Sequence, residues 1–257
     1  MALNFDQLME LAMDLGCGLM ECGAETYRVE ESMGFLLQAY GAKNPEVFAI
    51  PNCINLTITL PNGHSVTRIR RVANRNTDID QMEHFNDLCR KLCRETPPLE
   101  KAAELLAECR RSKHEYSMPM QIFGHFLGCG AFAMFFGGDW WDGLCGGLCG
   151  ILLCLCLWGL NHLGANPYFK TVVGAMVASA LAMFFVYIGL GTNPKKIIIG
   201  VLMALVPGIA FTNAMRDVMA GDMVAGISKA TEALFIGVAI ALGTAITLGL
   251  IRMLGGG

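Results

Sequence analysis

The second half of the chain contains five long apolar stretches separated by short polar segments. They cover residues 118–138, 143–162, 171–190, 197–214 and 230–253. At about 1.5 Å of helix rise per residue, each stretch can cross a hydrocarbon layer about 30 Å thick. A soluble helical domain would instead need a polar face on each helix, and these stretches are apolar on every side. The pattern predicts five transmembrane helices.

Charge divides the chain into two regions, because only 11 of its 19 basic and 22 acidic residues lie beyond residue 116. The first region has helical periodicity over residues 5–22, 25–40, 78–94 and 99–113, and β-type runs over residues 47–50, 54–60 and 65–70. We therefore expect an α-helical integral membrane protein with an N-terminal cytosolic α+β domain. The expected boundaries are residues 1–116 for that domain and 117–257 for the transmembrane domain.

Basic residues next to the apolar stretches favour a cytosolic N-terminal domain. Six of them fall on the side of that domain and three on the opposite side. The aromatic turn 139–142 suits an outer membrane interface, and residues 1–6 lack the basic segment of a signal peptide. We expect the protein in a bacterial inner or plasma membrane, surrounded by lipid, with its N-terminal domain in the cytoplasm.

Several classes of function lack support in the sequence. No GxSxG elbow, phosphate-binding glycine loop or HExxH motif is present, so we expect neither an enzyme nor ATP hydrolysis. Cys89 and Cys93 lie one helical turn apart with His84 nearby, but no CxxC pair occurs, so we expect no metal and no cofactor. The first region carries 17 acidic and 13 basic residues, which disfavours nucleic acid as a partner.

The fourth apolar stretch contains Pro207 and Gly208, which predict a break in the helix. Freed carbonyls and the positive N-terminus of the next half-helix would form a polar site suited to a carboxylate. Thr212 and Asn213 follow about one turn later, where a hydroxyl and an amide can contact the same solute. The alternative is a kink that neighbouring helices repair.

Four charged residues follow the break. Arg216 and Asp217 are either a loop ion pair that fixes topology or an inner gate, where Arg216 attracts an anion and Asp217 or Asp222 holds it. Glu232 is either paired with Lys229 at i, i+3 or a proton-coupling carboxylate whose pKa is raised by burial. The pairing is slightly favoured.

Two further groups are candidates. His125, in the first apolar stretch, is either a proton relay or a histidine hydrogen-bonded at a tight helix contact beside Gly124 and Gly128.

A polar cluster in the N-terminal region includes Glu25, Tyr27, Arg28 and Glu30. It is either an exposed helix face or part of a gate or sensor that touches the inner loops, with Arg28 and Glu30 as the residues to test.

The order of these motifs resembles the threonine/serine exporter family. The matching segments are GAETYRVE (23–30), RRV (70–72), LVPG (205–208), TN (212–213), RD (216–217), GD (221–222) and Glu232. More narrowly, the chain is similar to the larger subunit of the split type, in which a cytosolic domain with five spans works with a separate, smaller five-span protein. That resemblance implies a hetero-oligomeric partner, and export of threonine and serine or of succinate-like dicarboxylates.

Two hypotheses of function follow. In the first, the chain is a subunit of a secondary exporter of small carboxylate metabolites, driven by the proton gradient. In the second, it is a membrane-anchored cytosolic binding or scaffolding module without transport activity. Only the exporter needs Pro207 and Gly208 for its function.

Overall fold

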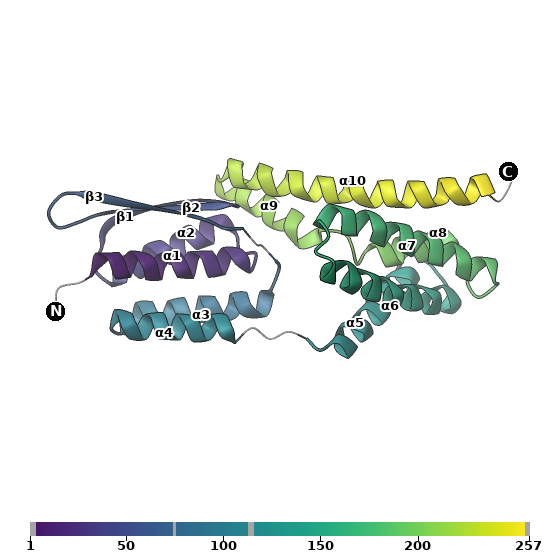
Figure 1. The fold of residues 1–257 in the computed structure, drawn as a ribbon, viewed down its shortest axis with the longest axis horizontal. Coiled ribbons are helices and arrows are strands. Elements are labelled where there is room, and N and C mark those ends of the chain that lie inside the picture. The colour runs from purple at the N-terminus through teal and green to yellow at the C-terminus, as the bar shows by residue number, and fades with distance from the viewer. Residues whose placement is uncertain (1–3, 74–75, 113–115, 255–257) are drawn as a thin grey trace. The chain divides into compact units, whose positions relative to one another are not determined.

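The computed structural model describes residues 4–73, 76–112 and 116–254. Within these residues the chain is mostly helical, with one three-stranded sheet (Figure 1). The helices are α1 (Phe5–Glu21), α2 (Thr26–Ala39), α3 (Ile79–Glu95), α4 (Leu99–Arg111), α5 (Met118–Phe135), α6 (Trp140–His162), α7 (Pro167–Tyr187), α8 (Pro194–Leu202), α9 (Gly208–Ala220) and α10 (Met223–Leu254). The strands are β1 (Lys43–Ile50), β2 (Cys53–Thr59) and β3 (Ser65–Arg71). Residue 113, the predicted end of α4, lies outside the described residues.

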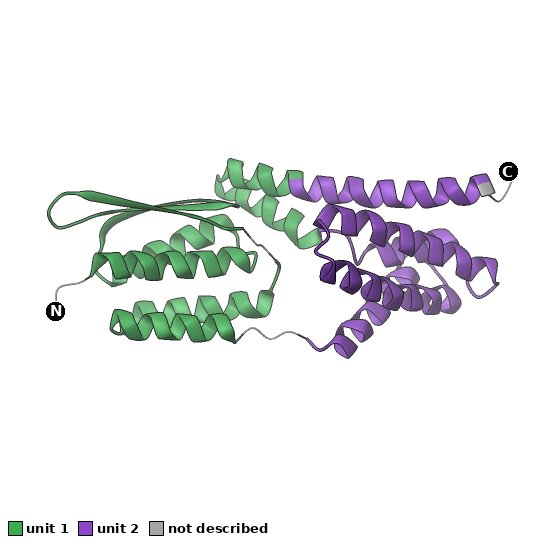
Figure 2. Cartoon of the chain, in the orientation of Figure 1, with its two compact units in different colours: residues 1–115, 208–231 green, residues 116–207, 232–257 purple. Residues whose placement is uncertain are grey.

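The chain forms two compact units (Figure 2). Unit 1 comprises residues 1–115 and 208–231, and unit 2 comprises residues 116–207 and 232–257. Unit 1 therefore joins the N-terminal residues to a segment that the sequence assigns to the membrane domain, namely α9 and the first turns of α10.

The N-terminal part of unit 1 has three layers: the sheet, then α1 and α2, then α3 and α4 (Figure 1). The sheet is antiparallel with β2 in the centre, as its alternating sequence and the turn before β3 predict. Ile54, Leu56 and Ile58 of β2 are fully buried, because alternate residues of a strand face the same side. They share one hydrophobic core with α1 and α2.

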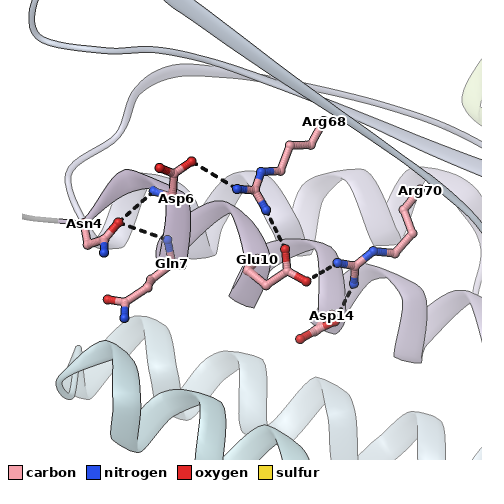
Figure 3. Close-up of polar contacts among 7 residues, drawn as sticks. All are labelled: Asn4, Asp6, Gln7, Glu10, Asp14, Arg68 and Arg70. Carbon is pink, nitrogen blue, oxygen red and sulfur yellow. Dashed lines mark hydrogen bonds and ion pairs between the residues drawn. The ribbon is translucent and has the colours of Figure 1, made fainter.

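Ion pairs fix β3 against α1 (Figure 3). Arg68 contacts Glu10 at 2.6 Å and Asp6 at 3.0 Å, and Arg70 pairs with Glu10 and Asp14. The carboxylates are spaced i, i+4 on the helix and the arginines i, i+2 on the strand, so each set lies on one face. These ion pairs fix the position of the hairpin along the helix.

Four helices in the described part of the chain are long and apolar enough to cross a membrane: α5, α6, α7 and residues 223–253 of α10. Three of the predicted stretches thus appear as α5, α6 and α7, and the last one begins seven residues earlier than predicted. These helices are those of an integral membrane protein.

The predicted fourth stretch, residues 197–214, is divided into two helices in the structure. α8 ends at Leu202, and α9 begins at Gly208. Between them, successive N–H groups donate to carbonyls three residues earlier, from Ala204 to Val206, and Pro207 has no N–H to donate. The break predicted at Pro207 is therefore present, and each of the two helices is too short to span by itself.

In unit 2, α5 and α6 pack through glycines of α6. A Cβ added at Gly150 would lie 2.5 Å from the carbonyl oxygen of His125, and one at Gly146 would lie 3.0 Å from that of Cys129. An added Cβ at Gly124 or Gly128 would meet nothing within 4 Å among the described atoms, so α6 approaches α5 beside His125 through Gly150 and not through these two glycines.

Asp142, near the start of α6, is buried and binds the loop before α8. Its Oδ1 accepts hydrogen bonds from the backbone N–H groups of Thr192 at 2.8 Å and Asn193 at 2.9 Å. Its Oδ2 accepts from the Thr192 hydroxyl at 3.0 Å, and Asp139 forms a capping box with Asp142. The predicted outer turn is therefore tied to the loop between α7 and α8.

Candidate functional site

The loop between α1 and α2 is the first part of the candidate site. α1 ends at Glu21, and Gly23 has φ +86°, a left-handed conformation that glycine adopts without a steric penalty. The following Glu25 is extended and occupies the N-cap position of α2, but its side chain does not cap that helix. The first N–H groups of α2 therefore need an acceptor from elsewhere.

One face of α9 provides the partners of this loop. Asn213, Arg216 and Asp217 are spaced i, i+3 and i+4, so they share a face of the helix. The Asn213 amide donates to the carbonyl of Gly23 at 3.1 Å. The Arg216 guanidinium contacts the Glu25 carboxylate at 2.7 Å, and Glu25 is 4% exposed.

Asp217 caps α2 from a distance of 191 residues in sequence. Its Oδ1 accepts the backbone N–H of Thr26 at 3.1 Å, and its Oδ2 accepts the Thr26 hydroxyl at 3.3 Å. Both side chains are fully buried. A carboxylate at a helix N-terminus also interacts favourably with the helix dipole. Asp217 therefore provides the side-chain cap of α2 that Glu25 does not provide.

Lys229, in the first turns of α10, completes the network. Its amino group lies 2.7 Å from Oδ2 of Asp217 and 3.4 Å from the carbonyl oxygen of Ala24. The lysine side chain is 10% exposed and that of Asp217 is fully buried. Removing either partner would leave a buried charge without a counter-ion, which makes this ion pair the most sensitive contact of the network.

A cavity of about 510 Å³ lies beside this network. Its polar lining comes from two regions of the sequence: Glu25, Arg28, Thr77, Thr212, Asn213 and Arg216. Gly208 and Ile209 place the first turn of α9 at the cavity, and Ile79 and Met82 of α3 add apolar surface. Six of the residues singled out from the sequence thus line a single cavity: Glu25, Arg28, Gly208, Thr212, Asn213 and Arg216.

Glu25 remains ionised in this cavity at neutral pH. Burial by itself raises the pKa of the carboxyl, but the hydrogen bonds from its own backbone N–H and from Arg216 lower it, as do the charges of Arg28 and Arg216. The net pKa is below its usual value. The cavity therefore presents one carboxylate and two guanidinium groups.

The pKa values of Glu30 and Asp222 are instead raised above their usual values. Burial raises the pKa of Glu30, the Ala49 N–H lowers it, and the charges of Asp222 and Asp217 raise it further. Glu30 also joins α2 to β1, because its Oε1 accepts that N–H at 2.6 Å. The pKa of Asp222 is raised by burial and by Asp217, and Lys229 opposes this shift. Both groups bind protons more readily than an exposed carboxylate.

The other predicted residues lie outside the cavity. Pro207 is the last residue before α9, Tyr27 is half-buried on α2, and Glu232 is half-buried on α10. The pairing of Glu232 with Lys229 stays a prediction. His125 lies in unit 2, where its Nδ1 is 2.9 Å from the Gln121 carbonyl oxygen of its own helix.

Two expectations about this region need correction. The cluster on α2 is not an exposed face throughout, because Glu25 is buried and Glu30 is half-buried. Arg216 and Asp217 lie inside α9 rather than in a loop, and their partners are Glu25, Thr26 and Lys229.

Sequence reasoning missed Thr26 and Thr77, and it considered Lys229 only as a partner of Glu232. Thr26 carried a local signal, since threonine at the start of a helix commonly takes part in capping. The position of Thr77 beside α9 had no such signal.

The model of the threonine/serine exporter family matches residues 10–251 of this chain. The chain is 22% identical over 247 residues to the "Probable threonine/serine exporter" of Mycobacterium tuberculosis (strain ATCC 25618 / H37Rv), a match that covers 96% of this chain and 46% of that protein. It is 24% identical over 252 residues to the "Threonine/serine exporter" of Corynebacterium glutamicum, covering 94% of this chain and 51% of that protein.

This chain spans about half the length of the curated relatives it matches. No solved structure matches it. Both relatives are named as exporters and neither as an enzyme. The family match covers the loop 23–26, α9 and the start of α10, which form the polar network. The chain therefore belongs to the threonine/serine exporter family.

Proposed function

We propose that this chain is a subunit of a secondary exporter of threonine and serine, and that the cavity beside α9 binds the amino acid on its way out. The observation that carries the proposal is the charge pattern of the cavity. Arg216 and Arg28 offer partners for a carboxylate, while the ionised Glu25 offers one for an ammonium group. A free amino acid carries both charges.

The first turn of α9 supports the same orientation. Gly208, Ile209 and Thr212 line the cavity at the N-terminal end of this helix, where backbone N–H groups and the helix dipole favour an anion. Thr77 and Thr212 place hydroxyl groups beside this position. We propose that the amino-acid carboxylate binds between this turn and Arg216, with the substrate hydroxyl near the two threonines.

The same pattern favours threonine and serine over succinate-like dicarboxylates. A second carboxylate would meet the negative charge of Glu25 where an ammonium group would find a partner. Like charges that face each other across a binding site cost several kcal/mol, so on the order of 100-fold discrimination is available from this single group.

We propose that α8 and α9 together make one broken crossing, the fourth of five. α8 belongs to unit 2 and α9 to unit 1, so the division between the two units falls at this break. With the N-terminal domain in the cytoplasm, the cavity opens to the cytoplasmic side.

Two further parts of the proposal concern the partner and the driving force. This chain matches only about half of each relative. We propose that a separate, smaller five-span subunit corresponds to the other half. We propose that the proton gradient drives export, with Glu30 and Asp222 as proton-binding groups, because the pKa of each is raised.

The decisive experiment is counterflow of labelled threonine, serine and succinate in proteoliposomes, with this chain alone and with the smaller subunit. Threonine and serine uptake that requires the pair, and that a protonophore changes, is expected. Uptake of succinate in preference to threonine would contradict the amino-acid assignment.

Variants separate a transporter from a membrane anchor. Pro207→Ala and Arg216→Ala are expected to abolish counterflow while the protein still inserts, because they remove the break in the helix and the carboxylate partner. Glu83→Gln is a matched control, since Glu83 is an exposed carboxylate on α3 that does not line the cavity. Full activity in both well-folded variants would leave the anchored binding module as the better hypothesis.

A further inference from the structure

A second cavity lies in unit 1 between α2 and α3. Its volume is about 690 Å³, within the range of small-molecule sites. All its lining residues come from these two helices, and none belongs to α9 or α10. It is therefore a separate groove from the cavity beside α9, although Arg28 lines both.

The groove is strongly positive. Three guanidinium groups line it, from Arg28, Arg90 and Arg94, against one carboxylate, from Glu31. Arg90 and Arg94 are spaced i, i+4 on α3, so they lie one turn apart on the same face, and Arg28 belongs to the opposite wall. Arginine forks bind carboxylate and phosphate oxygens in pairs, which suits this arrangement to an anion with more than one charged group.

These arginines form few strong ion pairs within the described part of the protein. Arg28 is 3.7 Å from Glu25 and Arg90 is 3.5 Å from Asp87, and both arginine side chains are more than half exposed. Exposed pairs of this kind contribute little to stability. Arg94 forms no ion pair with any residue in the described ranges.

The rest of the groove is uncharged and partly apolar. Phe35 is 61% exposed, and Cys89 and Cys93 form part of the wall. Burial, together with the neighbouring Cys93, raises the pKa of the Cys89 thiol to about 12, and burial also raises the pKa of Cys93. Both thiols are neutral at physiological pH, so they do not offset the arginine charges.

We propose that the groove between α2 and α3 binds a small organic anion with at least two negative charges and an apolar portion, a di- or tricarboxylate or a phosphate ester. The charged groups meet Arg90, Arg94 and Arg28, and the apolar portion packs against Phe35. Occupancy draws Arg28 from Glu25 and so changes the charge balance of the cavity beside α9. The groove is thus a cytoplasmic sensor site, and its binding does not depend on the proposed export activity.

The test is isothermal titration calorimetry on the detergent-solubilised full chain at fixed ionic strength, with citrate and phenyl phosphate as probes. Binding of at least one probe is expected, and the two arms distinguish carboxylate from phosphate-ester recognition. Arg94→Gln is expected to weaken binding at least about tenfold, since a hydrogen-bonded charge pair contributes more than 1.4 kcal/mol. Phe35→Ala is expected to weaken phenyl phosphate more than citrate.

Lys91→Gln is the matched control. Lys91 is exposed on α3, beside Arg90 in sequence, and does not line the groove, so its removal changes the net charge equally. Binding in this variant is expected to stay within about twofold of the parent, in line with the small effect of unpaired surface charges. The absence of binding by both probes, or equal weakening by Lys91→Gln and Arg94→Gln in folded protein, would overturn the proposal.

Discussion

Two buried aspartates, one in each unit, perform the same structural task with different partners. Asp217 is 0% exposed and Asp142 is 1% exposed, and each accepts N–H groups from residues where another helix begins. The second oxygen of Asp142 meets neutral donors, the Thr192 hydroxyl and the Asp139 N–H. The second oxygen of Asp217 meets the Lys229 ammonium at 2.7 Å.

The difference shows how one kind of contact can serve two purposes. Around Asp142 two donors are backbone N–H groups, and Asp142 forms no ion pair with any described residue, so the contact holds a loop in place. Around Asp217 the carboxylate belongs to a set of buried charges beside a cavity. A ligand or a proton that changes one of those charges changes the energy of the others.

The largest effect on stability is expected at Asp217, where the two aspartates differ most. Asp217→Asn keeps an acceptor for Thr26 but leaves Lys229 buried without a counter-ion, so we expect the free energy of unfolding to fall by about 3–5 kcal/mol. Asp142→Asn keeps an oxygen for both N–H groups and can donate to Thr192, so we expect a loss of about 1 kcal/mol. Thermal unfolding in detergent measures both, and equal losses would contradict the distinction.

A double variant tests the Asp217–Lys229 ion pair directly. Adding Lys229→Gln to Asp217→Asn removes the stranded charge, so we expect the pair of changes to recover at least about 1–2 kcal/mol of the loss. The complete double-mutant cycle, measured by the same unfolding experiment, gives the coupling free energy. Additive effects of the two changes would mean that the ion pair does not couple α9 to α10.

A smaller effect is expected at Arg216. Arg216→Gln leaves the Glu25 carboxylate buried, with Arg28 at 3.7 Å as its remaining ion-pair partner among the described residues, so we expect a loss of about 1–3 kcal/mol. Arg111→Gln removes an exposed charge at the end of α4 and should change stability by less than about 0.5 kcal/mol. Unfolding temperatures measure both, and a matching pair of small shifts would show that Arg216 is not part of the network.

The smallest expected effects depend on pH and have opposite signs. The pKa of Glu25 is lowered by folding, so its stabilisation is present above its unfolded-state pKa and is lost as the pH falls through the folded-state pKa. The pKa of Glu30 is raised, so its ionisation destabilises the fold at neutral pH, and this penalty disappears as the pH falls through the folded-state pKa.

Glu25→Gln should therefore lower the unfolding temperature at pH 7, and Glu30→Gln should raise it slightly, because glutamine can still accept the Ala49 N–H. Both differences should shrink on acidification. Unfolding scans over a pH series test this, and shifts of the same sign in the two variants would contradict the assignment of charges.

Much of the fold could be predicted from local patterns. The helical periodicity near Leu8 and Leu15, the alternation over residues 54–60 and the turn after Pro61 each match an element of the structure. The apolar stretches gave α5, α6 and α7 because length and composition alone decide whether a helix suits lipid. The candidate site was only partly predictable: Glu25 and Arg216 were singled out separately, while Lys229 and Thr77 gave no signal of their place beside them.

The sequence by itself determined the membrane class of this protein, the break at Pro207 and the β-hairpin, because each depends on residues close together in the chain. Only the tertiary structure decided that the loop at Gly23 meets α9, and that Asp217 caps a helix 191 residues away in sequence. A carboxylate can pair with any buried donor, and its sequence neighbours do not specify which one. The choice is made by packing, which brings Thr26 and Lys229 to the same oxygen.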